Sequence, residues 1–194
     1  MTCPPRIVQE LVAYARSHTG EKLTFASAGV GTTQHLAGEL FKAMANIDIQ
    51  HVPYRGAAPV ITDLLGGRLT MYFGAISPLI PLVQEGKVRA LAVTSAERFG
   101  ASPNLPTMIE AGFPGFVSIL SIGLMAPAGT SPAIIDKVHK DTMKVLAMPD
   151  VRKKLGDIGM EVIGNSPAEF AAAIKTETPQ WARVIKDAAI KASN

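Results

Sequence analysis

Apolar residues recur along this chain in two rhythms. In some segments they stand three and four residues apart, as on one face of a helix, and in others they form short continuous runs typical of buried strands. Helices are predicted at residues 7–15, 36–44, 59–65 and 79–83, and strands at 23–27, 47–52, 69–73 and 88–93. This alternation predicts an α/β fold with a mainly parallel sheet covered by helices on both faces.

The rhythm changes after Thr94, where residues 98–115 become rich in Gly, Pro, Ser and Asn and are followed by an apolar extended stretch. A change of this kind predicts a domain crossing near residues 116–128. We therefore expect one complete α/β lobe at 1–120 and a separate portion at 121–194, whose helices have little sheet of their own to cover.

Three proline residues open the helices predicted in that second portion. They are Pro132, with Ser131 as its N-cap, Pro149 and Pro167. A short strand is predicted at 161–163. A fourth proline, Pro179, falls inside the last helix and should kink or split it.

The bulk composition excludes several classes of protein. Hydrophobic residues make up 47% of the 194 residues and charged residues 18%, which is enough apolar material to fill a core and excludes wholesale disorder. The formal net charge is only +3 and the basic residues are scattered, so no nucleic-acid partner is predicted. The most apolar stretch, 116–126, has about half the residues that a membrane-spanning helix needs.

The N-terminus lacks the pattern of a secretory leader, because Met1 is followed by neither a basic region nor an apolar segment. We expect either a cytoplasmic protein or a chain whose N-terminal part is missing. Cys3 is the only cysteine, so an internal disulfide and a cysteine-based zinc site are excluded. We interpret Cys3 as incidental.

The most informative segment follows the first predicted strand and opens the next helix. Gly29 and Gly31 let the backbone turn tightly and approach a ligand closely. The free amide groups and the positive end of the helix then favour an anion. The hydroxyl groups of Thr32 and Thr33 can cap the helix and donate to an oxygen atom. This pattern indicates an anion site.

The same turn disfavours a nucleotide as the anion. A dinucleotide fingerprint needs a third glycine where Gln34 stands, and a phosphate loop of the Gly-Lys-Ser/Thr type needs a lysine that is absent. A carboxylate held by neutral donors fits better. The alternative is a plain strand-to-helix turn with a threonine cap, since a lone Gly-x-Gly is a weak signal.

A second polar segment ends the next predicted strand, where open α/β sheets carry their ligand loops. Tyr54 is positioned to wall a pocket, and Arg55 to meet a second carboxylate. The alternative is a solvent-facing arginine and a packed tyrosine.

No residue pattern predicts catalysis, a metal site or a cofactor. His35 lies one turn inside a helix without a nucleophile or carboxylate at a useful spacing, so we interpret it as a neutral structural histidine or one at the rim of a cleft. His18, His51 and His139 lack metal-ligand spacing. An enzyme that uses the Gly29–Thr33 turn as an oxyanion or phosphate site remains an alternative, with His35 as the residue to test.

Several blocks of sequence, in order, resemble one family of receptors. They are 26–41, 51–56, 62–67, 87–95, 106–115 and 123–130, and together they span most of the chain. The family is the Bug-type substrate-binding components of tripartite tricarboxylate transporters. The resemblance implies a type II periplasmic-binding-protein fold, with two α/β lobes that close over a small ligand in the cleft between them.

The resemblance also implies the ligand, the partners and the site. Family ligands are small carboxylates or acidic amino acids, with some neutral aromatic compounds, and they are delivered to a membrane permease. A role as a sensor that presents its ligand-bound form to a signalling partner is the alternative. The implied location is the periplasm. The implied ligand-binding residues are Ser27, Gly29, Val30, Gly31, Thr32 and Thr33, with Tyr54 nearby.

Three departures from the family pattern affect these expectations. The family's opening third is absent, which leaves apolar surface that favours a homodimer. Gly74 and Ala75 stand where an Asp-Asn-like pair is usual near the cleft, and Ser121 and Ile122 stand where an aromatic pair is usual. We expect weak or absent affinity for a ligand, because half of the cleft would be lost.

Overall fold

The structure is a computed structural model that describes residues 5–18, 20, 22–100 and 102–191; Cys3 lies outside them. Its elements in chain order are α1 (Val8–Ser17), β1 (Thr24–Ser27), α2 (Thr33–Ala45), β2 (Gln50–Pro53), α3 (Ala57–Leu65), β3 (Met71–Tyr72), α4 (Ile80–Gln84), α5 (Pro132–Leu146), α6 (Pro149–Asp157) and α7 (Pro167–Asp187). The chain forms two compact units. Unit 1 is Met1–Leu120 with Val184–Asn194, and unit 2 is Ser121–Arg183.

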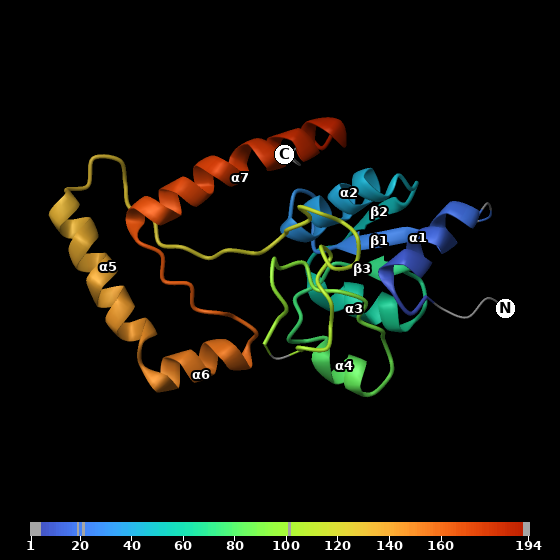
Figure 1. Ribbon diagram of the computed structural model, residues 1–194, viewed down its shortest axis with the longest axis horizontal. Coiled ribbons are helices and arrows are strands. Elements are labelled where there is room, and N and C mark those ends of the chain that lie inside the picture. The colour runs from blue at the N-terminus through green and yellow to red at the C-terminus, as the bar shows by residue number, and fades with distance from the viewer. Residues whose placement is uncertain (1–4, 19, 21, 101, 192–194) are drawn as a thin grey trace. The chain divides into compact units, whose positions relative to one another are not determined.

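Unit 1 is built on a parallel sheet of three strands in the order β2-β1-β3. Helices α2 and α3 lie on opposite sides of it (Figure 1). This confirms the predicted α/β class and parallel sheet. All three strands end at the same edge, so the loops that follow them are brought together there.

The central strand β1 separates two apolar clusters, because successive side chains of a strand point to opposite faces. Phe25 is fully buried in the larger cluster with Phe41, Ile49 and Phe116. Ala26 is buried on the other face in the smaller cluster, with Val60 and Leu69. The aromatic rings of the larger cluster fix the position of α2 over the sheet, with the Phe41 centroid 5.8 Å from that of Phe73.

The strand predicted at 88–93 is wrong. Only Val93 forms a bridge, with Thr107, because the amide of Val93 donates to the carbonyl of Pro106 at 2.8 Å and its carbonyl accepts from Met108 at 2.9 Å. The backbone at this point therefore pairs with the following connection and not with β3. Leu91 and Ala92 contribute to the core through their side chains alone.

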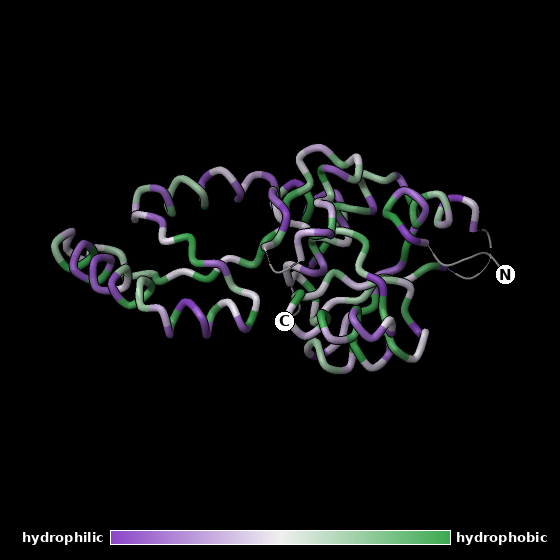
Figure 2. Tube along the Cα trace, turned by 60° about the horizontal axis from the view of Figure 1, so that its bottom comes forward, coloured by the Kyte–Doolittle hydropathy of each residue, from purple (hydrophilic) through white to green (hydrophobic). Residues whose placement is uncertain are grey.

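Unit 2 contains α5, α6 and most of α7. These helices alternate between polar and apolar residues along their length (Figure 2). The strand predicted at 161–163 is wrong, because the described part of unit 2 holds no strand that could pair with it. Ser131 is the N-cap residue of α5 as predicted, although its side chain forms no capping hydrogen bond.

Helix α7 runs through Pro179 without a break, so the predicted split is wrong. Proline removes one N–H from the helix and leaves the carbonyl of Lys175 without its usual donor. Both residues are exposed, so water can satisfy that carbonyl. The hydroxyl of Thr178 donates to the carbonyl of Ile174 at 2.6 Å in the same turn.

Candidate anion site at the strand ends

The turn between β1 and α2 is held by its own side chains. The Thr32 hydroxyl donates to the carbonyl of Gly29 at 2.7 Å and accepts the amide of His35 at 3.5 Å, which makes Thr32 the N-cap of α2 as predicted. Gly31 has a φ of 76°, a left-handed conformation that a side chain would strain. The turn is therefore preformed, with Val30 and Gly31 exposed at its tip.

Three backbone amides of this turn have no acceptor among the described residues. They belong to Val30, Thr33 and Gln34, and the last two are the first two positions of α2. Unpaired N–H groups at a helix N-terminus carry partial positive charge and bind anions. The residues predicted to bind the ligand also include Gly31 and Thr32, but the amides of these two already have acceptors. The Gly31 amide donates to Nδ1 of His35 at 3.1 Å, and the Thr32 amide donates to the Gly29 carbonyl at 3.4 Å.

Ser27 lies beneath the turn and not on its open face. Its side chain is fully buried, and its hydroxyl donates to the carbonyl of Gly29 at 2.8 Å. The same oxygen accepts the Gly29 amide at 3.2 Å. In this structure the Ser27 hydroxyl supports the backbone at Gly29, and the predicted contact of Ser27 with a ligand stays a prediction.

The loop after β2 lies beside this turn because the parallel pairing continues past the strands. The amide of Tyr54 donates to the carbonyl of Ser27 at 3.0 Å, and the amide of Gly56 donates to that of Ala28 at 3.1 Å. Arg55 is exposed between these two bonds. The structure thus brings the two predicted polar segments to one edge of the sheet.

The phenol of Tyr54 is committed to a neighbour. Its hydroxyl donates to Asp63 at 2.7 Å, and Arg68 donates to the other oxygen of the same carboxylate at 2.5 Å. The hydrogen bond from Tyr54, followed by that from Arg68, lowers the pKa of Asp63. The bond between Tyr54 and Asp63 also raises the pKa of Tyr54. The Tyr54 ring is therefore held in place by Asp63, a partner that the position of Asp63 on its helix did not indicate. That Tyr54 walls a ligand pocket stays a prediction.

A pair of stacked histidines supports the turn from below. The His35 and His51 rings lie 3.7 Å apart at an interplanar angle of 12°, and Phe25 stacks on His51 at 5.0 Å. His51 was not predicted to belong to the site. The register of the strands explains why His51 lies there: it is the partner of Phe25 on β2 and therefore faces the same side of the sheet.

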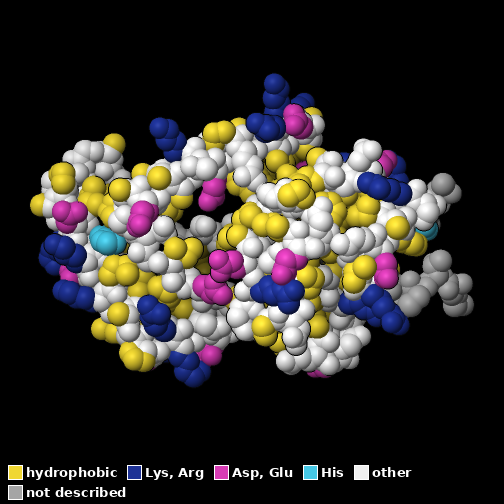
Figure 3. Space-filling model, viewed as in Figure 1, with side chains coloured by type: hydrophobic (Ala, Val, Ile, Leu, Met, Phe, Trp, Pro, Cys, Tyr) yellow, Lys and Arg dark blue, Asp and Glu magenta, His cyan; other side chains and the backbone are white. Residues whose placement is uncertain are grey.

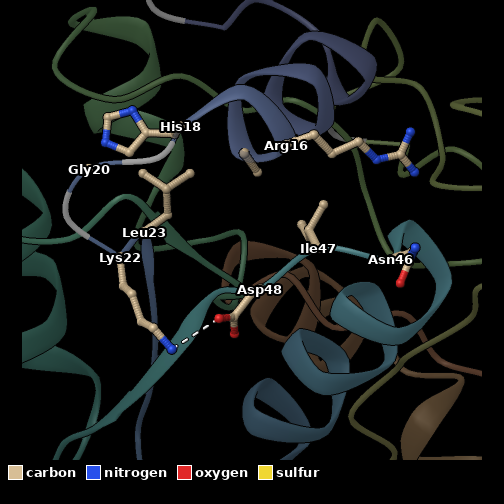
Figure 4. Close-up of a pocket in the computed structure, with 9 residues that line it drawn as sticks. Arg16, His18, Gly20, Lys22, Leu23, Asn46, Ile47 and Asp48 are labelled. Carbon is tan, nitrogen blue, oxygen red and sulfur yellow. Dashed lines mark ion pairs between the residues drawn. The ribbon is translucent and has the colours of Figure 1, made fainter.

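The described residues contain no cluster of His, Cys, Asp or Glu able to hold a metal ion. A shallow hollow of about 350 Å³ lies at the opposite edge of the sheet, before β1 and β2 (Figure 4). Its charged groups are already engaged, since Lys22 pairs with Asp48 at 3.0 Å and Arg16 donates to the carbonyl of Ala45. The unpaired donors therefore lie at the strand ends and not in this hollow.

Charge on the visible face is mixed, with basic and acidic side chains interspersed over both units (Figure 3). The described helices include none with the length and apolar character required to cross a membrane. The described residues of the visible face therefore offer no large basic patch that would attract an anion.

The chain matches relatives across most of its own length. The family model described as the tripartite tricarboxylate transporter family receptor matches residues 1–190. A UPF0065 protein from the tcbD-tcbE intergenic region of a Pseudomonas species is 38% identical over 97% of this chain and 56% of its own length. A UPF0065 protein of Pseudomonas knackmussii is 35% identical over 81% of this chain and 94% of its own.

Solved structures agree with these matches. An R. palustris protein solved with adipate has a TM-score of 0.82 and 34% identity, covering 97% of this chain and 63% of the other. MatC from Rhodopseudomonas palustris with bound malate has a TM-score of 0.74 and 30% identity, covering 94% of this chain and 63% of the other.

The periplasmic binding protein BugD has a TM-score of 0.76 and 33% identity, covering 98% of this chain and 64% of its own. The chain spans 56% and 52% of the length of two of the curated relatives that it matches. The match over residues 1–190, together with the shared fold, shows that this chain belongs to the tripartite tricarboxylate transporter receptor family of periplasmic binding proteins, a family of binding receptors and not of enzymes.

Proposed function

We propose that unit 1 binds one carboxylate group of a small dicarboxylate at the turn between β1 and α2, as part of an extracytoplasmic receptor that delivers this ligand to a membrane permease. The observation that supports the proposal is the set of unpaired amides of Val30, Thr33 and Gln34 beside the exposed Arg55. Four neutral or cationic donors at one edge suit an anion that is held without being changed.

The class of ligand follows from the donors and from the relatives. Backbone amides donate to any carboxylate, and the exposed Arg55 in the adjoining loop supplies a cationic donor for a second carboxylate. The two similar R. palustris structures carry adipate and malate, which are both dicarboxylates. We therefore propose a four- to six-carbon dicarboxylate for this chain.

We propose that the predicted lobe at 1–120 supplies this site and that 121–194 belongs to the second lobe of the receptor. The finding that residues Val184–Asn194 group with unit 1 modifies that division. Since the turn alone offers few contacts, we expect weak affinity for the chain by itself.

The test compares adipate with adipamide in a thermal-shift titration. Binding to the folded state raises stability by RT ln(1 + [L]/Kd), so adipate should raise the midpoint progressively. Adipamide has the same length without the charge and should raise it far less, because a hydrogen bond to a charged group contributes about 1.5–3 kcal/mol against about 1 kcal/mol for a neutral one. Equal effects of the two compounds would contradict the proposal.

We also propose that the chain self-associates through the apolar stretch at 119–125. Leu120, Ile122, Leu124 and Met125 have exposed fractions of 68%, 73%, 71% and 78%, and residues 119–126 make no backbone hydrogen bond within the described chain. A run of exposed apolar side chains with unpaired backbone is typical of an interaction surface.

Sedimentation velocity at increasing protein concentration tests this proposal. We expect a concentration-dependent dimer that the double change Ile122→Asn and Leu124→Asn abolishes. The change Ser121→Asn, in the same stretch, is the matched control and should leave the dimer intact. A chain that stays monomeric at high micromolar concentration would contradict the proposal.

A further inference from the structure

The turn that carries the free amides rests on two stacked imidazole rings, of which His35 is buried and His51 is half-buried. The exposed fraction of His35 is 5%, and its ring stacks on that of His51 with 3.7 Å between centroids. Each ring is bonded to the turn, His35 to the amide of Gly31 at 3.1 Å and His51 to the hydroxyl of Ser27 at 2.7 Å. The two histidines are therefore connected to both ends of the Gly29–Gly31 backbone.

The hydrogen-bond partners define where the protons lie. Nδ1 of His35 accepts the Gly31 amide, so the neutral ring carries its proton on Nε2. The Ser27 hydroxyl donates its one proton to the Gly29 carbonyl, so its oxygen accepts from Nε2 of His51. His35 is thus neutral in this arrangement, and burial favours the neutral form of His51, with its proton on Nε2.

The surroundings of the pair provide little compensation for a positive charge. Glu39 lies one turn further along α2, with its carboxylate 3.8 Å from Nε2 of His35, but Lys42 lies 3.4 Å from the same carboxylate. On the β1 side the neighbours are the Phe25 ring and the Ser27 hydroxyl, which are uncharged. Two charged rings stacked at this distance would also repel each other.

We propose that His35 and His51 are positioning residues that form an acid-labile latch, in which a proton on either ring releases the backbone at Gly31. A proton added to His35 must occupy Nδ1, where it faces the Gly31 N–H, and two donors cannot share a hydrogen bond. A proton added to His51 places a charge against the stacked His35 ring. In both cases the turn loses the conformation that presents the amides of Val30 and Thr33.

The pH range follows from burial. Burial lowers the pKa of His51 to about 4 and lowers the pKa of His35. Unfolded histidine has a pKa of about 6.5, so between about pH 6.5 and about pH 4 the unfolded chain binds more protons than the folded chain. The stabilisation from the neutral pair is therefore complete above that range and is lost as the pH falls through it.

The consequence for a ligand rests on the proposed function, whereas the release of Gly31 does not. If the turn binds a carboxylate, acid weakens that binding through the latch. The amide of Gly31 reports the latch directly, without any ligand present.

The experiment is an NMR titration from about pH 7.5 to about pH 3.5, which runs from above the pKa of unfolded histidine to below the pKa of about 4 of His51. We expect the protection of the Gly31 amide against hydrogen exchange, corrected for intrinsic rate, to fall about tenfold or more, equivalent to one lost hydrogen bond. The fall should follow the titration of the His35 and His51 ring signals. A Gly31 amide that keeps its protection while these rings titrate would overturn the proposal.

Two variants sharpen the test. His35→Asn places an amide oxygen near the position of Nδ1, and His51→Gln retains a donor near the position of Nε2, so the double variant should hold Gly31 protected throughout the titration. His18→Gln removes an exposed histidine directly after α1 and should behave as the wild type. Loss of protection in the double variant, at the pH at which the wild type loses it, would also overturn the proposal.

A ligand arm separates the two proposals. Adipate affinity should fall between about pH 7.5 and about pH 4 more steeply in the wild type than in the double variant. Protonation of the ligand itself affects both proteins equally, so the difference between them reports the latch. If adipate binds at no pH, the proposed function is contradicted. The protection of the Gly31 amide then decides by itself whether the latch exists.

Discussion

Gly38→Ala is expected to destabilise the chain by about 3 kcal/mol, at the upper end of the cost of overpacking a core. A Cβ atom at Gly38 would lie 2.0 Å from Cε2 and 2.3 Å from Cδ2 of Phe25. The Phe25 ring is fully buried and stacks on His51, so it has no room to move aside. Glycine at this position lets α2 approach β1 closely.

The direction of this effect is opposite to the local expectation, since alanine inside a helix is usually favoured over glycine by about 0.5–1 kcal/mol. Chemical denaturation followed by fluorescence and circular dichroism measures it. Gly156→Ala is the matched control, because Gly156 lies in α6 with open space around it, and that change should stabilise the chain slightly. An unchanged or higher midpoint for Gly38→Ala would contradict the packing described between α2 and β1.

Thr33→Pro is expected to weaken adipate binding by about ten- to hundredfold, equivalent to about 1.5–3 kcal/mol for one hydrogen bond to a charged group. Proline removes the N–H of the first residue of α2, a position at which proline is well tolerated. The preceding residue, Thr32, already has φ −69° and ψ 160°, which a following proline requires. The helix should therefore persist while one donor disappears.

Thr33→Ala is the control for this change, because it removes the hydroxyl and keeps the amide. Affinities of the three proteins for adipate, measured by NMR titration, separate the two groups. We expect a small loss for the alanine variant and a large one for the proline variant, with unchanged circular dichroism in both. A proline variant that binds adipate as tightly as the wild type would show that the Thr33 amide makes no contact.

Local signals in the sequence were sufficient for the elements that frame the site. The glycine turn and the threonine cap follow from residues adjacent in the chain, and both were predicted, although the helix predicted at 36–44 begins three residues later than α2 does. The strand at 88–93 was mistaken because an apolar run records burial and not the identity of its backbone partner. Pro179 was expected to break α7, but an exposed helix leaves its unpaired carbonyl to water.

The site itself was predictable only in outline. The turn and the β2 loop were identified separately, and parallel pairing joins them. Which amides remain free depends on side chains that approach from other elements, such as the ring of His35 against Gly31. The burial of Ser27 and the bond from Tyr54 to Asp63 likewise arise from packing across the sheet. Such contacts have no local pattern in a sequence.

The central claim is tested most directly by mapping bound adipate on the backbone amides by ¹H–¹⁵N NMR at neutral pH. The largest shifts are expected at the amides of Val30, Thr33 and Gln34, with smaller ones at Arg55 and Gly56 in the adjoining loop. Lys22 and Asp48, at the opposite edge of the sheet, should not move. Saturable shifts confined to that opposite edge, or none at the turn, would contradict the account.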